Sequence, residues 1–468
     1  MPLTRDIATL PSSHPTHATP PPDNRLSFMD QAYFSTTRAT GRDGFVQCLW
    51  VYDHGINLGG LNRFRRNLGR GLLGRRIERS PLPFGRHRWI AYQGPEIDIA
   101  DDARPRADFS DWADERTQLP VDPEHGPCWH LGVLPFTDGS TAVSLVVSHC
   151  LLDGLGIGAA ITDAVHGTTH DLGYPPPQSR PRLHAVLQDA RETARAVPEV
   201  GRALAKAARQ ARDRRRNPGQ AKAAPPQPVA GSGGDGGEQV VVPIITVQVD
   251  LDAWDARAKA LGGMSHHLVV GFAAKLGERL GRRRPSDGLV TLQLPISERA
   301  ENDTRALALS FVSINVDPTP VTHDLGGIRV ANARAFKTQR QAPEAQVGDL
   351  APLAMFLPKR ALKQVVDAAF DYGNLPVGCS NGGDVDPALG RPDGTDASYA
   401  AVRGGEQQVT RAYLEQTRGQ LTVWTARLGG SVCITVAAYQ PGATNSKPAL
   451  RELAAQTLAE FDLTGVID

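Results

Sequence analysis

Short apolar runs alternate with longer amphipathic stretches along the whole chain, a pattern that predicts mixed α and β structure in both halves. Residues 45–51 and 141–147 are β-branched or aromatic runs typical of strands, and the second is apolar almost throughout, as expected for a strand covered on both faces. The clearest local pattern spans 421–436, where Gly429-Gly430 separates two β-rich runs. It predicts a hairpin with a two-residue turn.

Helices are predicted where apolar residues recur on one face or where helix-forming residues dominate. Leu268, Phe272 and Leu276 are four residues apart, so a helix at 264–280 would present one apolar face. Residues 181–216 are rich in Ala, Leu, Arg and Glu and end in a basic run. Together these patterns predict helices at 181–216, 264–280 and 447–461, and further strands at 240–250 and 289–296.

The strongest boundary lies in the middle of the chain. Residues 217–238 contain too many Pro and Gly to bury enough surface to fold, which predicts a flexible linker. Residues 1–24 are rich in Pro, Ser and Thr and are predicted to be a disordered tail. We therefore expect an N-terminal lobe at 25–216 and a C-terminal lobe at 239–468.

Composition excludes several classes of protein. The 468 residues suffice for two or three domain-sized units, and 51 Lys and Arg nearly cancel 50 Asp and Glu, so no nucleic-acid partner is expected. The five cysteines are scattered without a CxxC pair, which argues against a disulfide framework and a structural metal site. No apolar run approaches the length of a transmembrane helix or signal segment, so a cytoplasmic location is expected.

The segment 146–160 carries the most informative chemistry. A buried strand is predicted to deliver His149 into a short loop, Asp153 follows four residues later, and Gly154 opens a helix. An imidazole with a pKa of about 6.5 is a natural base for a hydroxyl or amine nucleophile. Asp153 is expected to pin the turn, by pairing with an arginine and capping the helix, while Gly154 allows the sharp turn. A purely structural histidine and cap remain the plainer interpretation.

The same segment also has the outline of a dinucleotide-binding turn, because Gly154, Gly156 and Ala159 follow a strand and open a helix. A polar loop separates these glycines from the strand, whereas the two normally meet directly. No second strand ending in an acidic residue follows, since 166–177 has the composition of a loop. A nicotinamide-dependent oxidoreductase is therefore the weaker alternative.

Residues 148–154 (SHCLLDG) resemble the HHxxxDG signature of the CoA-dependent acyltransferase superfamily. That superfamily includes chloramphenicol acetyltransferase, condensation domains of nonribosomal peptide synthetases and bacterial wax ester synthase/diacylglycerol acyltransferases, and the last group is the most similar. Further segments resemble its LSxxD, PLDxxxPLW, PVSxR and "SN" motifs in the same order, at 26–30, 119–129, 294–299 and 374–381.

The resemblance implies a mixed α/β (α+β) fold of two chloramphenicol-acetyltransferase-like lobes, a pseudodimer with a tunnel at the interface. His149 would act as general base in direct acyl transfer, without a covalent acyl-enzyme. The donor would be acyl-CoA or the phosphopantetheine thioester of an acyl carrier protein, a co-substrate rather than a bound cofactor. The acceptor would be a small molecule with a hydroxyl or amine. Ser148, Ser380 and Asn381 would contact substrate.

The sequence departs from the family pattern at three places. Ser148 replaces the first histidine of the signature, His266-His267 replaces an Asn-Asp pair, and Ala308-Leu309 replaces a Gly-Asn pair. These departures indicate a divergent branch, and a catalytically silent binding protein of the same fold remains an alternative to the enzyme.

Asp153 is expected to pair with an arginine, and the candidates are Arg75, Arg76, Arg79 and Arg299. Cys150, next to His149, is expected to be an inert strand-end thiol. His266-His267 is expected to pack or cap a helix rather than bind metal, since no Glu or Cys lies at ligand spacing. The basic run 212–216 is predicted to be a solvated helix end, with a carrier protein or a peripheral lipid headgroup as the alternative partner.

Overall fold

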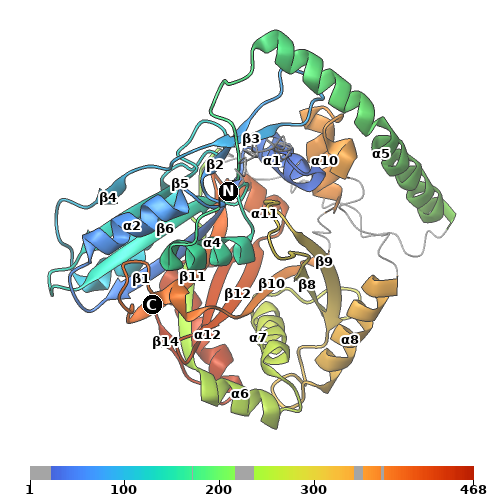
Figure 1. Ribbon diagram of the computed structural model, residues 1–468. Helices are drawn as coiled ribbons and strands as arrows, with labels where there is room; N and C mark the ends of the chain where they lie inside the picture. The colour runs from blue at the N-terminus through green and yellow to red at the C-terminus, as the bar shows by residue number, and fades with distance from the viewer. Residues whose placement is uncertain (1–22, 171, 217–236, 342–350, 370–373) are drawn as a thin grey trace, which may run out of the picture.

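The computed structural model describes residues 23–170, 172–216, 237–341, 351–369 and 374–468. Two large sheets lie at its centre, with helices packed around them (Figure 1). A separate two-stranded ribbon pairs β2 (Arg75–Glu78) with β3 (Arg88–Ala91). The predicted tail and linker fall almost wholly outside the described residues and stay predictions.

The first sheet has the strand order β11-β1-β6-β5-β4 and is antiparallel from β11 to β5, with β4 parallel to β5. Its strands, in that order, are Tyr399–Gln407, Asp43–Tyr52, Thr141–Ser148, Trp129–Pro135 and Ile97–Ile99. Strand β11 comes from the second half of the chain, so the two predicted lobes are not separate units of sequence. Strands β1 and β6 are buried along their whole length, as the apolar runs predicted.

The second sheet has the order β14-β7-β13-β12-β10-β8-β9. Its strands, in that order, are Val466–Ile467, Ile244–Asp250, Ser431–Tyr439, Gln420–Leu428, Val377–Asp384, Val290–Ser297 and Leu309–Val316. The predicted hairpin is confirmed, because Gly429 and Gly430 form the turn between β12 and β13 with φ of 59° and 80°. The strand predicted at 240–250 begins only at Ile244, directly after Pro243, which has no N–H to donate.

Helices cover both sheets. Those of the first half are α1 (Phe28–Thr40), α2 (Leu58–Leu68), α3 (Phe109–Gln118), α4 (Gly154–His166) and α5 (Arg182–Arg216). Those of the second half are α6 (Leu251–Ala260), α7 (Ser265–Arg279), α8 (Gly326–Gln341), α9 (Ala351–Ala354), α10 (Lys359–Ala369), α11 (Arg411–Gln416) and α12 (Lys447–Glu460). The helices predicted at 181–216, 264–280 and 447–461 correspond to α5, α7 and α12.

The cores explain how the layers are ordered. Helices α2 and α4 bury their apolar residues on one face of the first sheet, whereas α7 and α12 cover the second sheet. The opposite face of the first sheet packs against α3 and against the second sheet, where Leu49 shares a cluster with Cys433 and Phe45 with Ala437. The sheets are therefore joined by a continuous apolar contact.

The end of the predicted tail needs one correction. Asn24 was placed in the disordered segment, but its carbonyl accepts from Trp89 N at 2.6 Å and its side chain donates to Trp89 O at 2.9 Å. Helix α1 then begins with Ser27 as N-cap and Asp30 closing a capping box. Asn24 therefore belongs to the folded body.

Candidate active site

His149 lies at the end of the central strand β6, where the chain leaves the sheet. Its backbone N–H donates to Gly44 O of β1 at 2.8 Å, which carries the strand pairing one residue beyond β6. The chain then turns tightly, because Leu151 N donates to Ser148 O at 2.9 Å. The pairing with β1 and this turn therefore fix the position of the His149 backbone.

Asp153 ends the turn and begins α4. Its Oδ1 accepts from Gly156 N at 2.8 Å, which makes it the N-cap. Its Oδ2 accepts from Arg299 Nη2 at 2.7 Å and from Ala308 N at 3.0 Å, and both charged side chains are almost fully buried. The structure thus pairs Asp153 with Arg299, one of the four candidates, across the two halves of the chain.

The other three candidates have different partners. Arg75 is fully buried, with Nη2 donating to Leu151 O at 2.8 Å and its guanidinium lying 4.1 Å from the centre of the Trp89 ring. Arg79 pairs with Glu124. For Arg76, no side-chain ion pair is recorded within the described residues. Arg75 supports the backbone of the turn rather than the Asp153 carboxylate.

The loop 303–308 of the second half is held by three segments of the first half at once. Asp30 of the LSxxD-like segment accepts from Ala306 N at 3.2 Å and Leu307 N at 2.9 Å. Arg75 donates to Thr304 O at 2.5 Å, and Asp153 N donates to Ala306 O at 2.8 Å. We call these contacts, with the Asp153–Arg299 pair, the loop clamp. It joins the two halves directly beside His149.

The environment of His149 favours a neutral imidazole. The residue is half-buried, and burial is the main cause that lowers the pKa of His149 below its usual value near 6.5, opposed by its own backbone and by the charge of Asp153. Within the described part of the chain, no group lies in hydrogen-bonding position to its buried Nδ1. A neutral imidazole can accept a proton, which is what a general base requires.

Tyr33 of α1 is a neighbour of His149 that the sequence did not single out. The two rings are 5.6 Å apart between centroids and tilted by 50°. The space above Gly44 lies between them, because a Cβ there would be 3.3 Å from His149 Cβ and would collide with the Tyr33 hydroxyl. Glycine at this strand position therefore lets the phenol and the imidazole occupy adjacent positions.

Replacing Gly44 with alanine is expected to displace the Tyr33 ring rather than unfold the protein, since the colliding atom is the end of a side chain. If both rings line the reacting site, activity should fall by about 10- to 100-fold, the cost of misplacing a positioned group. The double variant Gly44→Ala/Tyr33→Phe, which removes the colliding oxygen, should recover part of it. Rates of the acyl transfer that the sequence resemblance implies, measured for the three proteins, check this prediction, and an unchanged rate in Gly44→Ala would contradict it.

The residues predicted to contact substrate lie in two different places. Ser148 is buried, and its hydroxyl accepts from Cys150 N at 3.3 Å, so it serves the turn. Asn381 lies on β10, where its Oδ1 accepts from Gly383 N at 2.9 Å and from Thr425 Oγ1 at 3.3 Å. Ser380 is its neighbour on the same strand, and its carbonyl faces the same Thr425 hydroxyl. Contact of these residues with substrate stays a prediction.

The remaining sequence candidates have structural surroundings. Cys150 is buried next to the Thr37 hydroxyl, and burial raises its thiol pKa to about 12, so it stays protonated. His267 is buried at the start of α7, and its Nδ1 accepts from Met264 N at 3.1 Å, which caps the helix. Its ring centroid is 3.9 Å from that of His266, and burial lowers the pKa of His267 to about 4.

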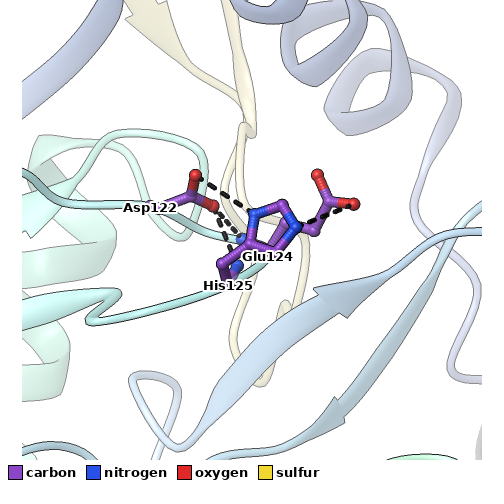
Figure 2. A group of neighbouring side chains, drawn as sticks. All are labelled: Asp122, Glu124 and His125. Atoms are coloured by element: carbon purple, nitrogen blue, oxygen red, sulfur yellow. Dashed lines mark hydrogen bonds and ion pairs between the residues drawn. The ribbon is translucent and has the colours of Figure 1, made fainter.

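Asp122, Glu124 and His125 lie close enough together to suggest a cation site, as Figure 2 shows. Both carboxylates are already paired, Asp122 with Arg38 at 2.7 Å and Glu124 with Arg79 at 2.6 Å. These contacts tie the PLDxxxPLW-like loop to α1 and to the segment after β2. Two arginines at the carboxylates would repel a metal ion, so the cluster is better described as an ion-pair network.

The N-terminus of α4 does not suit a dinucleotide. Asp153 occupies it with a carboxylate, and a Cβ at Gly156 would lie 2.9 Å from Arg299, so this glycine accommodates the guanidinium. The sheet around β6 is antiparallel, whereas a dinucleotide turn joins parallel strands. Gly156 is therefore explained by the loop clamp. The expectation that Gly154 is needed for a sharp turn is wrong, because its φ is not positive and a Cβ there would meet nothing within 4 Å.

One pocket of about 300 Å³ opens near the clamp but not at His149. Its lining comes from two loop segments, within 69–74 and within 169–174, and from Ala91. Tyr174 belongs to this lining, and its hydroxyl accepts from Arg75 Nη1 at 3.3 Å. Arg75 also holds Leu151, so this arginine lies between the pocket and the turn after β6. The tunnel expected between the lobes stays a prediction.

Comparisons with solved structures identify the fold. The first condensation domain of the calcium-dependent antibiotic synthetase matches with a TM-score of 0.54 and 11% identity over 94% of this chain and 97% of that one. The wax ester synthase/diacylglycerol acyltransferase of Marinobacter aquaeolei VT8 matches with 0.52 and 14% over 94% and 98%. The trichothecene 15-O-acetyltransferase of Fusarium sporotrichioides matches with 0.54 and 10%, over 94% of each. No family model and no curated sequence matches the chain.

The chain therefore has the two-lobed, mixed α/β fold of condensation domains and CoA-dependent acyltransferases, which confirms the fold class predicted from the sequence. At identities of 10–14% it is a divergent representative of that fold. Among the helices of the described residues, none is both long and apolar enough to cross a bilayer.

Proposed function

We propose that the protein is an acyltransferase in which His149 takes a proton from a hydroxyl or amine acceptor. The donor is a thioester of CoA or of a carrier-protein phosphopantetheine. The observation that carries the proposal is the half-buried imidazole of His149, whose pKa is lowered by burial, held at the loop clamp between the two halves of the chain. The fold shared with acyltransferases and condensation domains supports it.

The reaction follows from what a positioned base can do. His149 removes the proton as the acceptor oxygen or nitrogen attacks the thioester carbonyl, and protein hydrogen-bond donors stabilise the oxyanion that forms. The C–S bond then breaks, and the imidazolium returns the proton to the leaving thiolate. The products are an ester or amide and a free thiol, and no acyl-enzyme forms. Ser380 and Asn381 are proposed contacts of the substrate, and the cytoplasm is the proposed location.

A silent binding protein of the same fold is the second candidate, favoured by the buried, turn-capping role of Ser148 and by the His267 helix cap where the family pattern has other residues. Such a protein would bind a thioester without releasing its thiol. The half-buried His149 lies four residues before Asp153 of the loop clamp, which supports the enzyme over the binding protein.

The test is thiol release from a panel of acyl-CoA and acyl-phosphopantetheinyl carrier donors of different chain length, each mixed with pooled alcohols and amines. Release that depends on the acceptor, with the matching ester or amide found by mass spectrometry, is expected. The same donor without acceptor should leave the protein mass unchanged. Absence of acceptor-dependent release with every donor would contradict acyl transfer and favour the binding protein.

The rate should persist at mildly acidic pH. Only the neutral imidazole is a base, and because burial lowers the pKa of His149, the neutral form survives below the ordinary value of about 6.5. The profile of kcat/KM from about pH 5 to 8 should therefore be flat near neutrality and reach half of its plateau below about pH 6.5. If kcat/KM reached half of its plateau above about pH 6.5, burial would not be the main influence on the pKa of the catalytic base.

A further inference from the structure

Helix α5 is 35 residues long and lies on the outside of the molecule, as Figure 1 shows (green, upper right). One side of it faces the body. Ala185 and Ala203 are buried there, and Asp189 pairs with Arg88 at 3.2 Å and with Arg180 at 2.9 Å. Glu192, one turn further on, also pairs with Arg88. Asp189 and Glu192 thus point inward and are neutralised, whereas Glu199, the third acidic residue between the buried alanines, is exposed.

The outward side carries an uncovered apolar stripe. Leu183 is 80% exposed, Leu187 59%, Val197 61% and Leu204 62%. Their spacing of four, ten and seven residues keeps them on one face of a helix. The other positions on this face are also exposed and small, namely Ala190, Ala194 and Gly201 between these residues and Ala208 after them. Four large apolar side chains on one helix face are more than scattered surface residues would give.

A row of arginines borders this stripe. Arg191, Arg195, Arg202 and Arg209 are all exposed and follow one another at four, seven and seven residues, so they form a second line along the helix. No ion pair with any described residue is recorded for these four guanidinium groups. The helix therefore turns two paired acidic side chains to the protein, and its apolar stripe and arginine row, with Glu199, to the surroundings.

One of a pair of exposed aromatic rings lies close in sequence to α9, the helix on which α5 packs. Helix α5 packs on α9, and Phe356, just beyond α9, stacks on Phe84 with ring centroids 5.6 Å apart. Both rings are exposed, Phe84 to 49% and Phe356 to 36%. An aliphatic stripe beside a basic row, as on α5, is typical of a helix that lies at a membrane interface.

Charge decides between the possible occupants of this face. A second copy of α5 on the stripe would add another row of like charges close to the first, and like charges repel. An anionic lipid surface offers an apolar boundary for the stripe and negative headgroups for the arginines. We infer that α5 lies in the plane of an anionic membrane surface, with Leu183, Leu187, Val197 and Leu204 inserted at the headgroup boundary and the arginine row among the headgroups. This inference does not depend on acyl transfer.

The experiment measures binding of the full-length protein to vesicles of phosphatidylglycerol and phosphatidylcholine, and to vesicles of phosphatidylcholine alone, by co-sedimentation. The wild type should bind the anionic vesicles, and binding should weaken as salt shortens the Debye length. Changing all four residues of the arginine row to glutamine should weaken binding on the order of 100-fold, since each contributes a few-fold near such a surface. Changing the four large residues of the stripe to serine should weaken it similarly.

The matched control removes the same number of exposed cations from α8, on another side of the molecule, by changing Arg329, Arg334, Lys337 and Arg340 to glutamine. This control should bind anionic vesicles like the wild type. The inference would be overturned by equal binding to neutral vesicles, by wild-type binding in the arginine variant, or by loss of binding in the α8 control. It would also be overturned if the wild type bound neither kind of vesicle. That result would stand whether light scattering then showed a dimer formed through α5 or the protein bound an acidic protein instead.

Discussion

Replacing His149 with alanine is expected to lower the rate of the proposed acyl transfer by at least about 100-fold, the usual contribution of a general base. The side chain is half-buried at the end of β6, and its backbone bond to Gly44 does not involve the ring, so the loop should keep its shape. The loss should therefore appear in kcat, with the melting temperature almost unchanged. Thiol release under saturating donor measures it.

His166→Ala is the control for this change, because His166 lies at the exposed end of α4 and its nearest charged partner, Asp386, is 4.0 Å away. It should retain wild-type activity. If His149→Ala kept the full rate while His166→Ala did too, His149 would have no part in proton transfer, and the acyl transfer would need another base.

Replacing Arg299 with methionine is expected to destabilise the protein by about 3–5 kcal/mol, the cost of leaving a buried charge without its partner. The side chains of Arg299 and Asp153 are only 11% and 6% exposed, so water cannot take over the role of the guanidinium. Arg299 also donates to Asp303 O at 3.0 Å and Ala306 O at 3.1 Å, so the loop clamp would loosen as well. Urea unfolding of wild type and variant gives the free-energy difference.

Arg391→Met provides the comparison, since Arg391 pairs with Asp396 at the surface, where the two side chains are 48% and 81% exposed. A surface pair of this kind contributes no more than about 1 kcal/mol. Equal losses in the two variants would mean that burial of the Asp153–Arg299 pair carries no special weight in this fold.

The sequence predicted those features that depend on neighbouring residues. The turn at Gly429-Gly430 and the cap at Asp153 are local, because a few residues decide the backbone conformation. The strands at 45–51 and 141–147 were predictable because they are buried on both faces and hence apolar throughout. The order of the motifs added the two-lobed fold, which the solved structures confirm.

Other features depend on residues far apart and escaped prediction. Strand β11 (YAAVRGGEQ) contains two glycines and a buried Arg403, so it lacks the pattern of a strand, and its pairing with β1 had no local signal. The partner of Asp153 could only be narrowed to four arginines, since the chosen one lies 146 positions away. Nothing in the sequence marks Tyr33 as a neighbour of His149 except that it follows Asp30 of the LSxxD-like segment by three residues. Both lie in α1, which packs beside His149.

The position of β11 has a consequence for how the chain is made. Arg42, just before β1, and Glu406 of β11 form an ion pair across 364 positions of sequence. At about 5–20 residues per second, the ribosome therefore needs roughly tens of seconds to supply the partner of β1. During that time the buried edge of the first sheet has no strand beside it and can pair with other nascent chains. The yield of soluble protein should therefore depend on translation speed and on chaperones that cover such an edge.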